Sequence, residues 1–175
     1  MNPRITNVVT RANLHCKLNL RNIVSKVMNV IYNPKKYSGL IWHHRHIKSK
    51  CFVFHTGIIL CMGNNTLKDA KKDIRKYGRL LCKLGYNVHI IQIKLVTQSA
   101  VATLSGKLHI TEAFHFLKGT YEPELFRALM LKYGRIHFTC FSSGKVIMTG
   151  IRNLKDVLGV LQSLEVFTYK SVFTN

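Results

Sequence analysis

The chain has 175 residues and carries 27 Lys and Arg against 7 Asp and Glu, which gives a formal net charge of +20. Its hydrophobic fraction of 47% is ordinary for a folded protein, and no run approaches the roughly 18 apolar residues that a membrane span needs. So large a positive charge destabilises a compact body by self-repulsion unless a polyanion neutralises it. The composition therefore excludes a disordered tail and a membrane-spanning protein and favours a nucleic-acid partner.

The chain shows no sign of export. Its first residues lack the basic segment followed by an apolar one that marks a secretory signal. The five cysteines are an odd number without a C-x-x-C pair, and they are expected to be reduced and mostly buried. Both features indicate a protein of the cell interior.

The first segments predict a strand and then a helix. Residues 7–11 alternate between polar and apolar side chains, as a half-buried strand does. Asn19 stands where an N-cap is expected, before a helix at residues 20–28. The apolar face of that helix consists of Ile23, Val24, Val27 and Met28.

Further strands and a basic helix follow. Short strands are predicted at residues 40–42, 50–54 and 58–62. A helical stripe of apolar residues then runs from Ala70 to Leu84 and ends at Gly85, a typical C-cap residue. The other face of this helix carries Lys71, Lys72, Arg75, Lys76, Arg79 and Lys83.

The second half of the chain repeats the order of the first. Residues 54–63 and 141–150 share a Phe, a hydroxyl residue, a Gly, two aliphatic residues and a closing Gly at similar spacing, and Tyr-x-Pro-x-x-aromatic begins at both Tyr32 and Tyr121. The last helix of the second half is predicted from Val157, Leu161, Leu164 and Thr168.

This duplication predicts two similar repeats, residues 1–88 and 89–175, without a Pro-, Gly- or Ser-rich linker between them. The expected fold class is α+β, with antiparallel strands covered on one face by helices.

Several motifs resemble the core of the TATA-box-binding protein family and its related factors. They are Ile5-Thr-Asn-Val-Val9, Cys16-Lys-Leu-Asn-Leu20, Tyr32-Asn-Pro-Lys-Lys-Tyr37, Arg75-Lys-Tyr77, Lys83-Leu-Gly85, Tyr121-Glu-Pro-Glu-Leu-Phe126 and Ser143-Gly-Lys145. The resemblance covers nearly the whole chain. It implies a saddle: two pseudo-symmetric repeats forming one curved antiparallel sheet, with helices on the convex face and DNA under the concave face.

The resemblance also implies aromatic wedges. This family is itself a standard example of minor-groove reading by a sheet, in which inserted apolar side chains kink DNA by about 80°. The matching pairs here are Tyr37 with Phe54, and Phe126 with Phe141. Tyr37 replaces a Phe and adds a hydroxyl that needs a partner. Core packing is the alternative for each ring taken alone.

Between the wedges, the family reads the minor groove of A·T pairs with Asn, Thr and Val. Asn and Thr bond the degenerate acceptors, and Val rejects the amino group of guanine. The matching residues here are Asn7, Val9, Leu60, Met62, Thr97, Ser99, Ile147 and Thr149.

Five residues depart from the family pattern. Thr97 replaces an Asn, Ser99 a Val and Met62 a Thr, and the neighbours of the wedges change, with Phe52 and Thr139 each in place of a Leu. The surface under the sheet is therefore asymmetric, and its second half is more polar. These residues support minor-groove binding to A·T-rich promoter DNA but leave the preference for TATA DNA open.

Two further groups follow from the resemblance. The cations in segments that the family places near the edge of the DNA are Arg11, Lys35, Lys36, Arg45, Lys94, Lys132 and Lys145, and we expect phosphate contacts from them, with ordinary solvated charge as the alternative. The acidic loop Glu122, Glu124 and Leu125 matches the one that receives transcription factor IIB, with a plain turn as the alternative. The basic helix resembles one that meets other general factors.

A metal site and an enzyme are both disfavoured. His43, His44 and His46 lie close to Cys51, but on a strand His43 faces away from the other two, and the spacing fits no zinc-finger pattern. The seven acids offer no catalytic pair, and there is no Gly-rich phosphate loop. We therefore expect no metal, no cofactor and no small-molecule substrate.

Two functions from different classes remain. The first is a nuclear transcription initiation factor that binds and bends promoter DNA and recruits transcription factor IIB and other general factors; it needs wedges at both ends. The second is an interaction module or decoy that holds general factors with little TATA-specific binding; it needs the acidic loop and the basic helix. A weaker third is architectural binding through charge alone.

Overall fold

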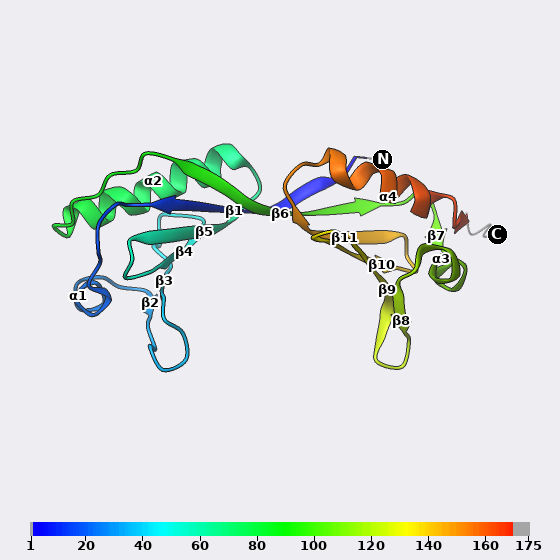
Figure 1. Ribbon diagram of the computed structural model, residues 1–175, viewed down its shortest axis with the longest axis horizontal. Coiled ribbons are helices and arrows are strands. Elements are labelled where there is room, and N and C mark those ends of the chain that lie inside the picture. The colour runs from blue at the N-terminus through cyan, green and yellow to red at the C-terminus, as the bar shows by residue number, and fades with distance from the viewer. Residues whose placement is uncertain (1, 170–175) are drawn as a thin grey trace. The chain divides into compact units, whose positions relative to one another are not determined.

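The computed structural model describes residues 2–169, and Figure 1 shows its elements. Its helices are α1 (Leu20–Lys26), α2 (Leu67–Lys83), α3 (Ile110–Leu117) and α4 (Lys155–Glu165). Its strands are β1 (Arg4–Asn13), β2 (Val30–Ile31), β3 (Leu40–Trp42), β4 (Lys50–Val53), β5 (Ile58–Asn64), β6 (Ile93–Thr103), β7 (Lys107–Leu108), β8 (Thr120–Glu122), β9 (Phe126–Tyr133), β10 (Ile136–Phe141), β11 (Lys145–Ile151) and β12 (Thr168–Tyr169). The predicted order of strand, helix, several strands and helix is confirmed in each half. None of the helices in the described part is long and apolar enough to cross a membrane.

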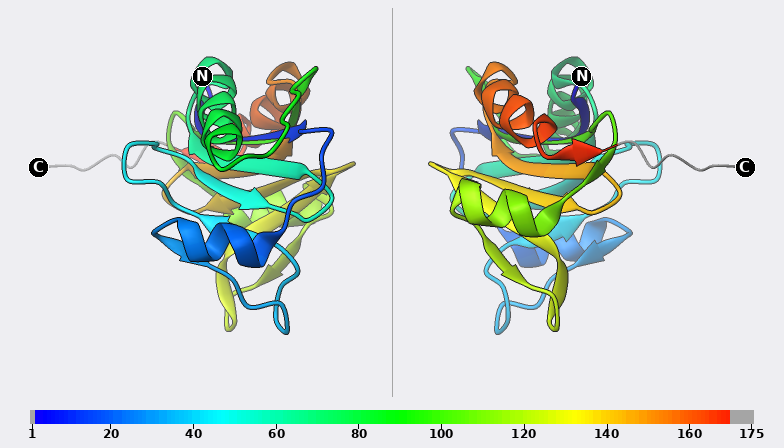
Figure 2. Two further views of the ribbon diagram at one scale, coloured as in Figure 1. Left: turned by 90° about the vertical axis from the view of Figure 1, so that its left-hand side faces the viewer. Right: turned by 90° about the vertical axis from the view of Figure 1, so that its right-hand side faces the viewer.

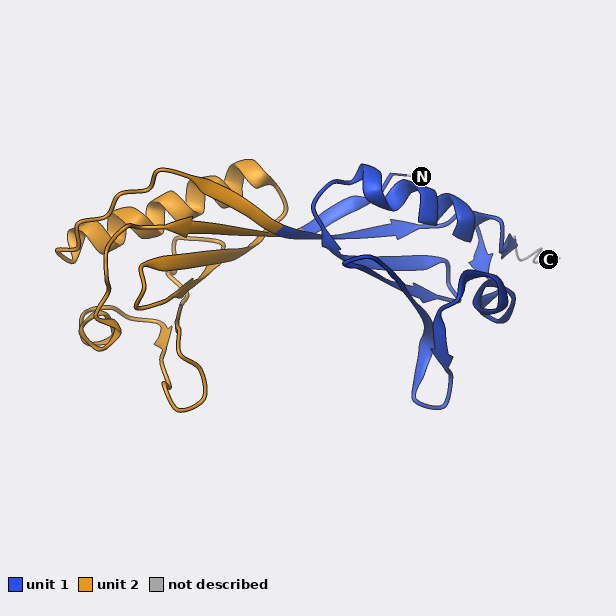
Figure 3. Ribbon diagram, in the orientation of Figure 1, with its two compact units in different colours: residues 1–6, 97–175 blue, residues 7–96 orange. Residues whose placement is uncertain are grey.

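The strands join in the order β2-β3-β4-β5-β1-β6-β11-β10-β9-β8, while β7 and β12 form a separate two-stranded sheet. The chain divides into two compact units, unit 2 (Asn7–Val96) and unit 1 (Met1–Thr6 with Thr97–Asn175), coloured in Figure 3. The predicted repeats, 1–88 and 89–175, do not coincide with these units. The Thr6 hydroxyl donates to the carbonyl of Ser99, so the start of β1 associates with unit 1. The His89 amide donates to the carbonyl of Leu14, so the segment before β6 associates with unit 2.

One face of the unit 2 sheet is buried under α1 and α2. Ile59 and Cys61 of β5 are fully buried and pack with Ile74 and Leu81 of α2. The residues between them, such as Leu60, are half-exposed, because successive side chains of a strand point to opposite faces. We call the face that the helices leave uncovered the open face.

Unit 1 is built in the same way. Val146 and Met148 of β11 are buried with Val157 and Leu161 of α4, and Ile147 between them is half-exposed. Figure 2 shows the strands lying beneath α2 in one unit and beneath α4 in the other. Each unit therefore has its own hydrophobic core and its own open face.

Two predicted helix ends are wrong. The first helix ends at Lys26, because Val27 is already extended, and Met28 is 82% exposed instead of lying on the apolar face. Thr168 is not on the last helix, which ends at Glu165; it pairs with Leu108 across β12 and β7. The N-cap at Asn19 is confirmed, since its side chain accepts from the Asn22 amide at 3.1 Å.

A buried carboxylate ties α2 to the sheet of unit 2. Asp73 is 5% exposed and accepts hydrogen bonds from Asn64 Nδ2 at 2.9 Å, Lys76 Nζ at 3.2 Å and the Ser49 amide at 3.3 Å. Burial alone would raise the pKa of Asp73, but these hydrogen bonds outweigh it and lower the pKa below its ordinary value. The charged form is therefore the one that stabilises the fold.

We predict that Asp73→Ala lowers the free energy of unfolding by about 1–3 kcal/mol at pH 7, because it leaves buried donors without a partner. Since the folded-state pKa is lowered, the contribution is complete above the unfolded value of about 3.9 and is lost as pH falls through the folded-state pKa. Urea denaturation between pH 7 and pH 3 measures this. The exposed Asp156 of α4 gives the control, Asp156→Ala, and a difference between wild type and Asp73→Ala that does not shrink in acid would contradict the prediction.

Candidate nucleic-acid interface

The open face of unit 2 carries an apolar row across its strands. Ile41 of β3 stands opposite Phe52 of β4, and Phe52 stands opposite Leu60 of β5. Leu60 in turn stands opposite Arg11 of β1. All three apolar side chains are half-exposed although no helix covers them. The row thus offers a partner an apolar floor with a cation at one end.

The open face of unit 1 has the equivalent row with different chemistry. Thr139 of β10 lies between Met130 of β9 and Ile147 of β11, and Ile147 stands opposite Val101 of β6. In the next row, His137 lies between Lys132 and Thr149. The hydroxyls of Thr139 and Thr149 therefore stand where unit 2 has the apolar Phe52 and Met62, and His137 stands where unit 2 has Lys50.

Each unit carries a pair of aromatic rings at the end of its open face. The ring centroids of Tyr37 and Phe54 are 5.9 Å apart with planes at 68°, and those of Phe126 and Phe141 are 6.1 Å apart with planes at 76°. Tyr37 is 41% exposed and Phe126 is 46% exposed, so neither ring belongs to a core. The structure thus brings together both predicted pairs, and their exposure removes the reason for assigning Tyr37 and Phe126 to core packing.

A missing side chain makes room for the first pair. A Cβ at Gly39 would lie 2.8 Å from Cε1 of Tyr37 and 2.9 Å from Cε1 of Phe54. In unit 1 the position opposite Phe141 is filled by the buried Ala128. The rings of Tyr37 and Phe54 therefore lie closer to the backbone of Gly39 than they could if this residue had a side chain.

A β-bulge lies at the matching place in each unit. In unit 2, Met62 and Gly63 together oppose Val9, and Gly63 has a φ of 116°. In unit 1, Thr149 and Gly150 together oppose Ser99. Bulges re-aim neighbouring side chains, and this one needs a glycine because its φ is positive.

The bulge in unit 2 orients Asn7. The Gly63 amide donates to Asn7 Oδ1 at 2.8 Å, which fixes the amide group because an N–H can bond only to the oxygen. Within residues 2–169 the amide nitrogen of Asn7 has no acceptor, so its two N–H donors are available to a ligand. Thr97, the matching residue in unit 1, lacks this arrangement: its hydroxyl approaches the Gln98 carbonyl at 3.5 Å.

The seven predicted phosphate-contacting cations are all exposed, and none contacts an acidic group within the described residues. Arg11 and Lys94 line one hollow of about 330 Å³ together with His15. Lys145 stands opposite Thr103, and Lys132 opposite His137, both on the open face of unit 1. Lys35 and Lys36 lie in the turn before Tyr37, where the Lys36 amide donates to the Asn33 carbonyl.

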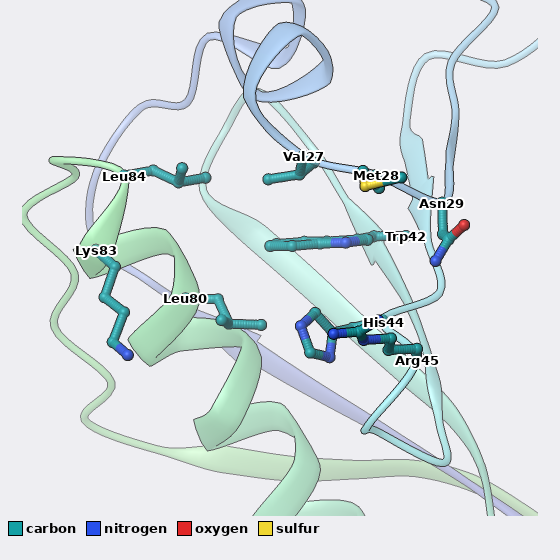
Figure 4. Close-up of a pocket in the computed structure, with 9 residues that line it drawn as sticks. All are labelled: Val27, Met28, Asn29, Trp42, His44, Arg45, Leu80, Lys83 and Leu84. Atoms are coloured by element: carbon teal, nitrogen blue, oxygen red, sulfur yellow. The ribbon is translucent and has the colours of Figure 1, made fainter.

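Arg45 lies apart from the other cations. It lines a pocket of about 380 Å³ with Trp42, Leu80 and Lys83, on the side of unit 2 that α2 covers (Figure 4). Its Nε donates to His46 Nε2 at 2.9 Å. A phosphate contact from Arg45 stays a prediction that this placement does not favour.

The His-rich segment, His43, His44 and His46, lies beside this pocket. Partial burial, together with the charges of His46 and Arg45, lowers the pKa of His44. Across residues 2–169, no three His, Cys, Asp or Glu side chains gather closely enough to hold a metal ion.

The acidic loop joins β8 to β9 and stands clear of both cores. The Leu125 amide donates to the Glu122 carbonyl at 3.0 Å, which closes a tight turn. Leu125 is 81% exposed, and Glu122 and Glu124 are exposed as well. The loop therefore presents two carboxylates and an apolar side chain in a protein that is otherwise strongly basic.

The sequence alone did not point to four residues of the open face. Ile41, Val101, Met130 and His137 lie in the rows described above, which strand register defines. The matching spacing of the repeats could have found Val101, because it stands where the predicted Arg11 stands in the first repeat.

Comparison with known proteins agrees with this geometry. Residues 2–84 and 92–164 match the family described as transcription factor TFIID (or TATA-binding protein, TBP). The chain is 33% identical to TATA box-binding protein-like 2 of Rattus norvegicus over 93% of this chain and 48% of that protein. It is 32% identical to the TATA-box-binding protein of Candida albicans over 93% of this chain and 70% of that protein. Its fold matches Methanococcus jannaschii TBP with a TM-score of 0.84 and 24% identity, over 95% of this chain and 98% of that one.

Two similar units with paired rings and a basic surface define a two-repeat fold of the α+β class. The chain belongs to the TATA-binding protein family, a family of DNA-binding transcription initiation factors. It spans about half the length of the rat relative, 48%.

We predict that Gly39→Ala lowers the free energy of unfolding by about 0.5–1.5 kcal/mol, because the new methyl group pushes the rings of Tyr37 and Phe54 away from their preferred rotamers. Gly159→Ala in α4 is the matched control, since a Cβ there meets nothing within 4 Å. Alanine should stabilise that helix by about 0.5–1 kcal/mol. Urea denaturation of both variants measures the two signs, and a neutral or stabilising Gly39→Ala would contradict the close approach.

Proposed function

We propose that this chain is a nuclear transcription initiation factor that binds promoter DNA in the minor groove, bends it and recruits general transcription factors. The observation that carries the proposal is the exposed aromatic pair at the end of each open face, Tyr37 with Phe54 and Phe126 with Phe141. Two such pairs suit a ligand that must be opened at two places. A duplex with a base step unstacked at each end is such a ligand.

The energetics favour rings at these positions. Opening a base step costs a few kcal/mol, and an aromatic face recovers part of the lost stacking. The surrounding cations supply the rest, because neutralising phosphates releases condensed counterions. Affinity is therefore expected to fall steeply as salt rises.

Between the rings, unit 2 offers groups that suit A·T pairs. The free N–H donors of Asn7 match the acceptors at adenine N3 and thymine O2, and Val9 and Leu60 offer nothing to the amino group of guanine. Phosphate contacts then fix the position of the protein along the DNA, and Asn7, Val9 and Leu60 contact the base edges at the floor of the minor groove.

The acidic loop supports recruitment of a basic partner similar to transcription factor IIB. Glu122 and Glu124 are exposed and unpaired by any cation within the described residues, so they are free to pair with Lys or Arg of a partner. Leu125 supplies an apolar anchor at the tip. Other general factors are expected to meet the basic face of α2.

A second candidate is an interaction module that holds general factors with little TATA-specific binding. Thr97, Ser99 and Thr139 favour it, because each removes a family contact on the open face of unit 1. The ring pair of unit 1 favours the first candidate. Binding of DNA only when the IIB-like factor is present would decide for the second.

We predict that Phe126→Ala with Phe141→Ala lowers affinity for an A·T-rich duplex about 10- to 100-fold and reduces its bend, because no ring then replaces the lost stacking. Gel shift and end-to-end energy transfer on the duplex measure both effects. Phe116→Ala is the control, since this ring of unit 1 is 75% exposed but stacks on Phe167 away from the open face. Unchanged binding and bending in the double variant would falsify the wedge mechanism.

We predict that Glu122→Gln with Glu124→Gln weakens binding of the IIB-like factor about tenfold and leaves binding to DNA alone unchanged. The exposed Glu112 and Asp156 provide the control, Glu112→Gln with Asp156→Asn, which makes the same change of charge elsewhere on unit 1. Supershift assays and titration calorimetry measure the two affinities. Equal losses in the loop variant and the control would mean that net charge, and not the loop, attracts the partner.

A further inference from the structure

The two open faces differ in their hydrogen-bonding chemistry at equivalent positions. In unit 2, Phe52, Leu60 and Met62 present apolar side chains. In unit 1, Thr139 and Thr149 stand where Phe52 and Met62 stand in unit 2, and Ser99 replaces Val9. Strand register, and not sequence spacing alone, puts these residues on one face.

The hydroxyls of unit 1 are available to a ligand. Within residues 2–169, no group is hydrogen-bonded to the side-chain oxygens of Ser99, Thr139 or Thr149. Each hydroxyl can donate one hydrogen bond and accept two. The open face of unit 1 therefore carries three free hydroxyl acceptors, whereas Asn7 Oδ1 on the open face of unit 2 already accepts from the Gly63 amide.

The minor groove distinguishes base pairs by one group. G·C presents the amino group of guanine N2, a donor, where A·T presents only acceptors. Against the side chains of unit 2 this amino group would be buried without a partner, which costs much of its hydration. Against a Thr or Ser hydroxyl it finds an acceptor.

We infer that the DNA site is asymmetric: unit 2 requires A·T pairs, whereas unit 1 accepts G·C pairs through the hydroxyls of Ser99, Thr139 and Thr149. A·T pairs still fit unit 1, because the same hydroxyls donate to their acceptors. The base composition of the two half-sites then sets the orientation of the protein on the DNA. This inference rests on the proposed minor-groove binding and names its sequence specificity.

Three duplexes of equal length test the inference: all A·T, half A·T with half G·C, and all G·C. The half-and-half duplex should bind within about fivefold of the all-A·T duplex, because each amino group gains a hydroxyl partner under unit 1. The all-G·C duplex should lose about 5- to 150-fold for each pair that contacts unit 2. Replacing guanine by inosine, which lacks only the amino group, should restore binding of the all-G·C duplex.

Orientation gives an independent readout. Cys82 is exposed in unit 2 and accepts a dye, after Cys16→Ser removes the half-exposed second thiol. Energy transfer to an acceptor dye should be stronger from the A·T end of the half-and-half duplex than from its G·C end. Equal transfer to both ends would overturn the inference.

Variants separate the hydroxyls from general effects. Ser99→Ala with Thr139→Val and Thr149→Val should weaken the half-and-half duplex about 5- to 150-fold relative to all-A·T DNA, and Thr111→Val in α3 should not. Failure to bind or bend any duplex would sink the proposed function itself, whereas strong binding with equal penalties for G·C in either half would overturn the asymmetry alone.

Discussion

Each half-sheet in this protein is covered by helices on one face only, and the rest of the surface chemistry depends on that constraint. Because strand side chains alternate, burying Ile59 and Cys61 under α2 forces Leu60 and Met62 onto the uncovered face. Unit 1 does the same with Val146 and Met148 inside and Ile147 outside. The apolar side chains on the uncovered face do not belong to a core, so they are available to a ligand. The net charge of +20 favours a polyanion as that ligand.

The duplication keeps geometry while its chemistry diverges. Both units place a β-bulge with a positive-φ glycine, Gly63 or Gly150, on the strand that faces the reading residue. In unit 2 the bulge amide holds Asn7, whereas in unit 1 the matching residue is Thr97 and no equivalent hydrogen bond forms. The bulge is thus kept in both repeats although the reading residue beside it differs. A bulge depends on the glycine and on the strand register, and not on the side chain of the reading residue.

Much of the fold could be predicted because local patterns coincide with tertiary burial. The basic helix and the strands at residues 40–42, 50–54 and 58–62 show strong periodicity, and the aromatic pairs follow from the spacing of the repeats. The errors lie where packing overrides local pattern. Met28 continues an apolar stripe but is exposed, because the chain turns into β2 after Lys26, and Thr168 leaves the last helix because a strand partner, Leu108, is available. Arg45 lies in a segment that was expected to contact phosphate, but the folded chain places it beside α2.

The sequence by itself determined the family, the two repeats, the ring pairs and the excess of positive charge, because these reside in residue identity and spacing. The tertiary structure decided which side chains share a face: it put His137 between Lys132 and Thr149, placed Gly39 against two rings and tied Asn7 to the Gly63 amide. The residues that these contacts join lie far apart in the sequence, and Asn7 and Gly63 are separated by 56 positions. Only strand register and a bulge bring such distant groups within hydrogen-bond reach, and neither leaves a periodic trace in the chain.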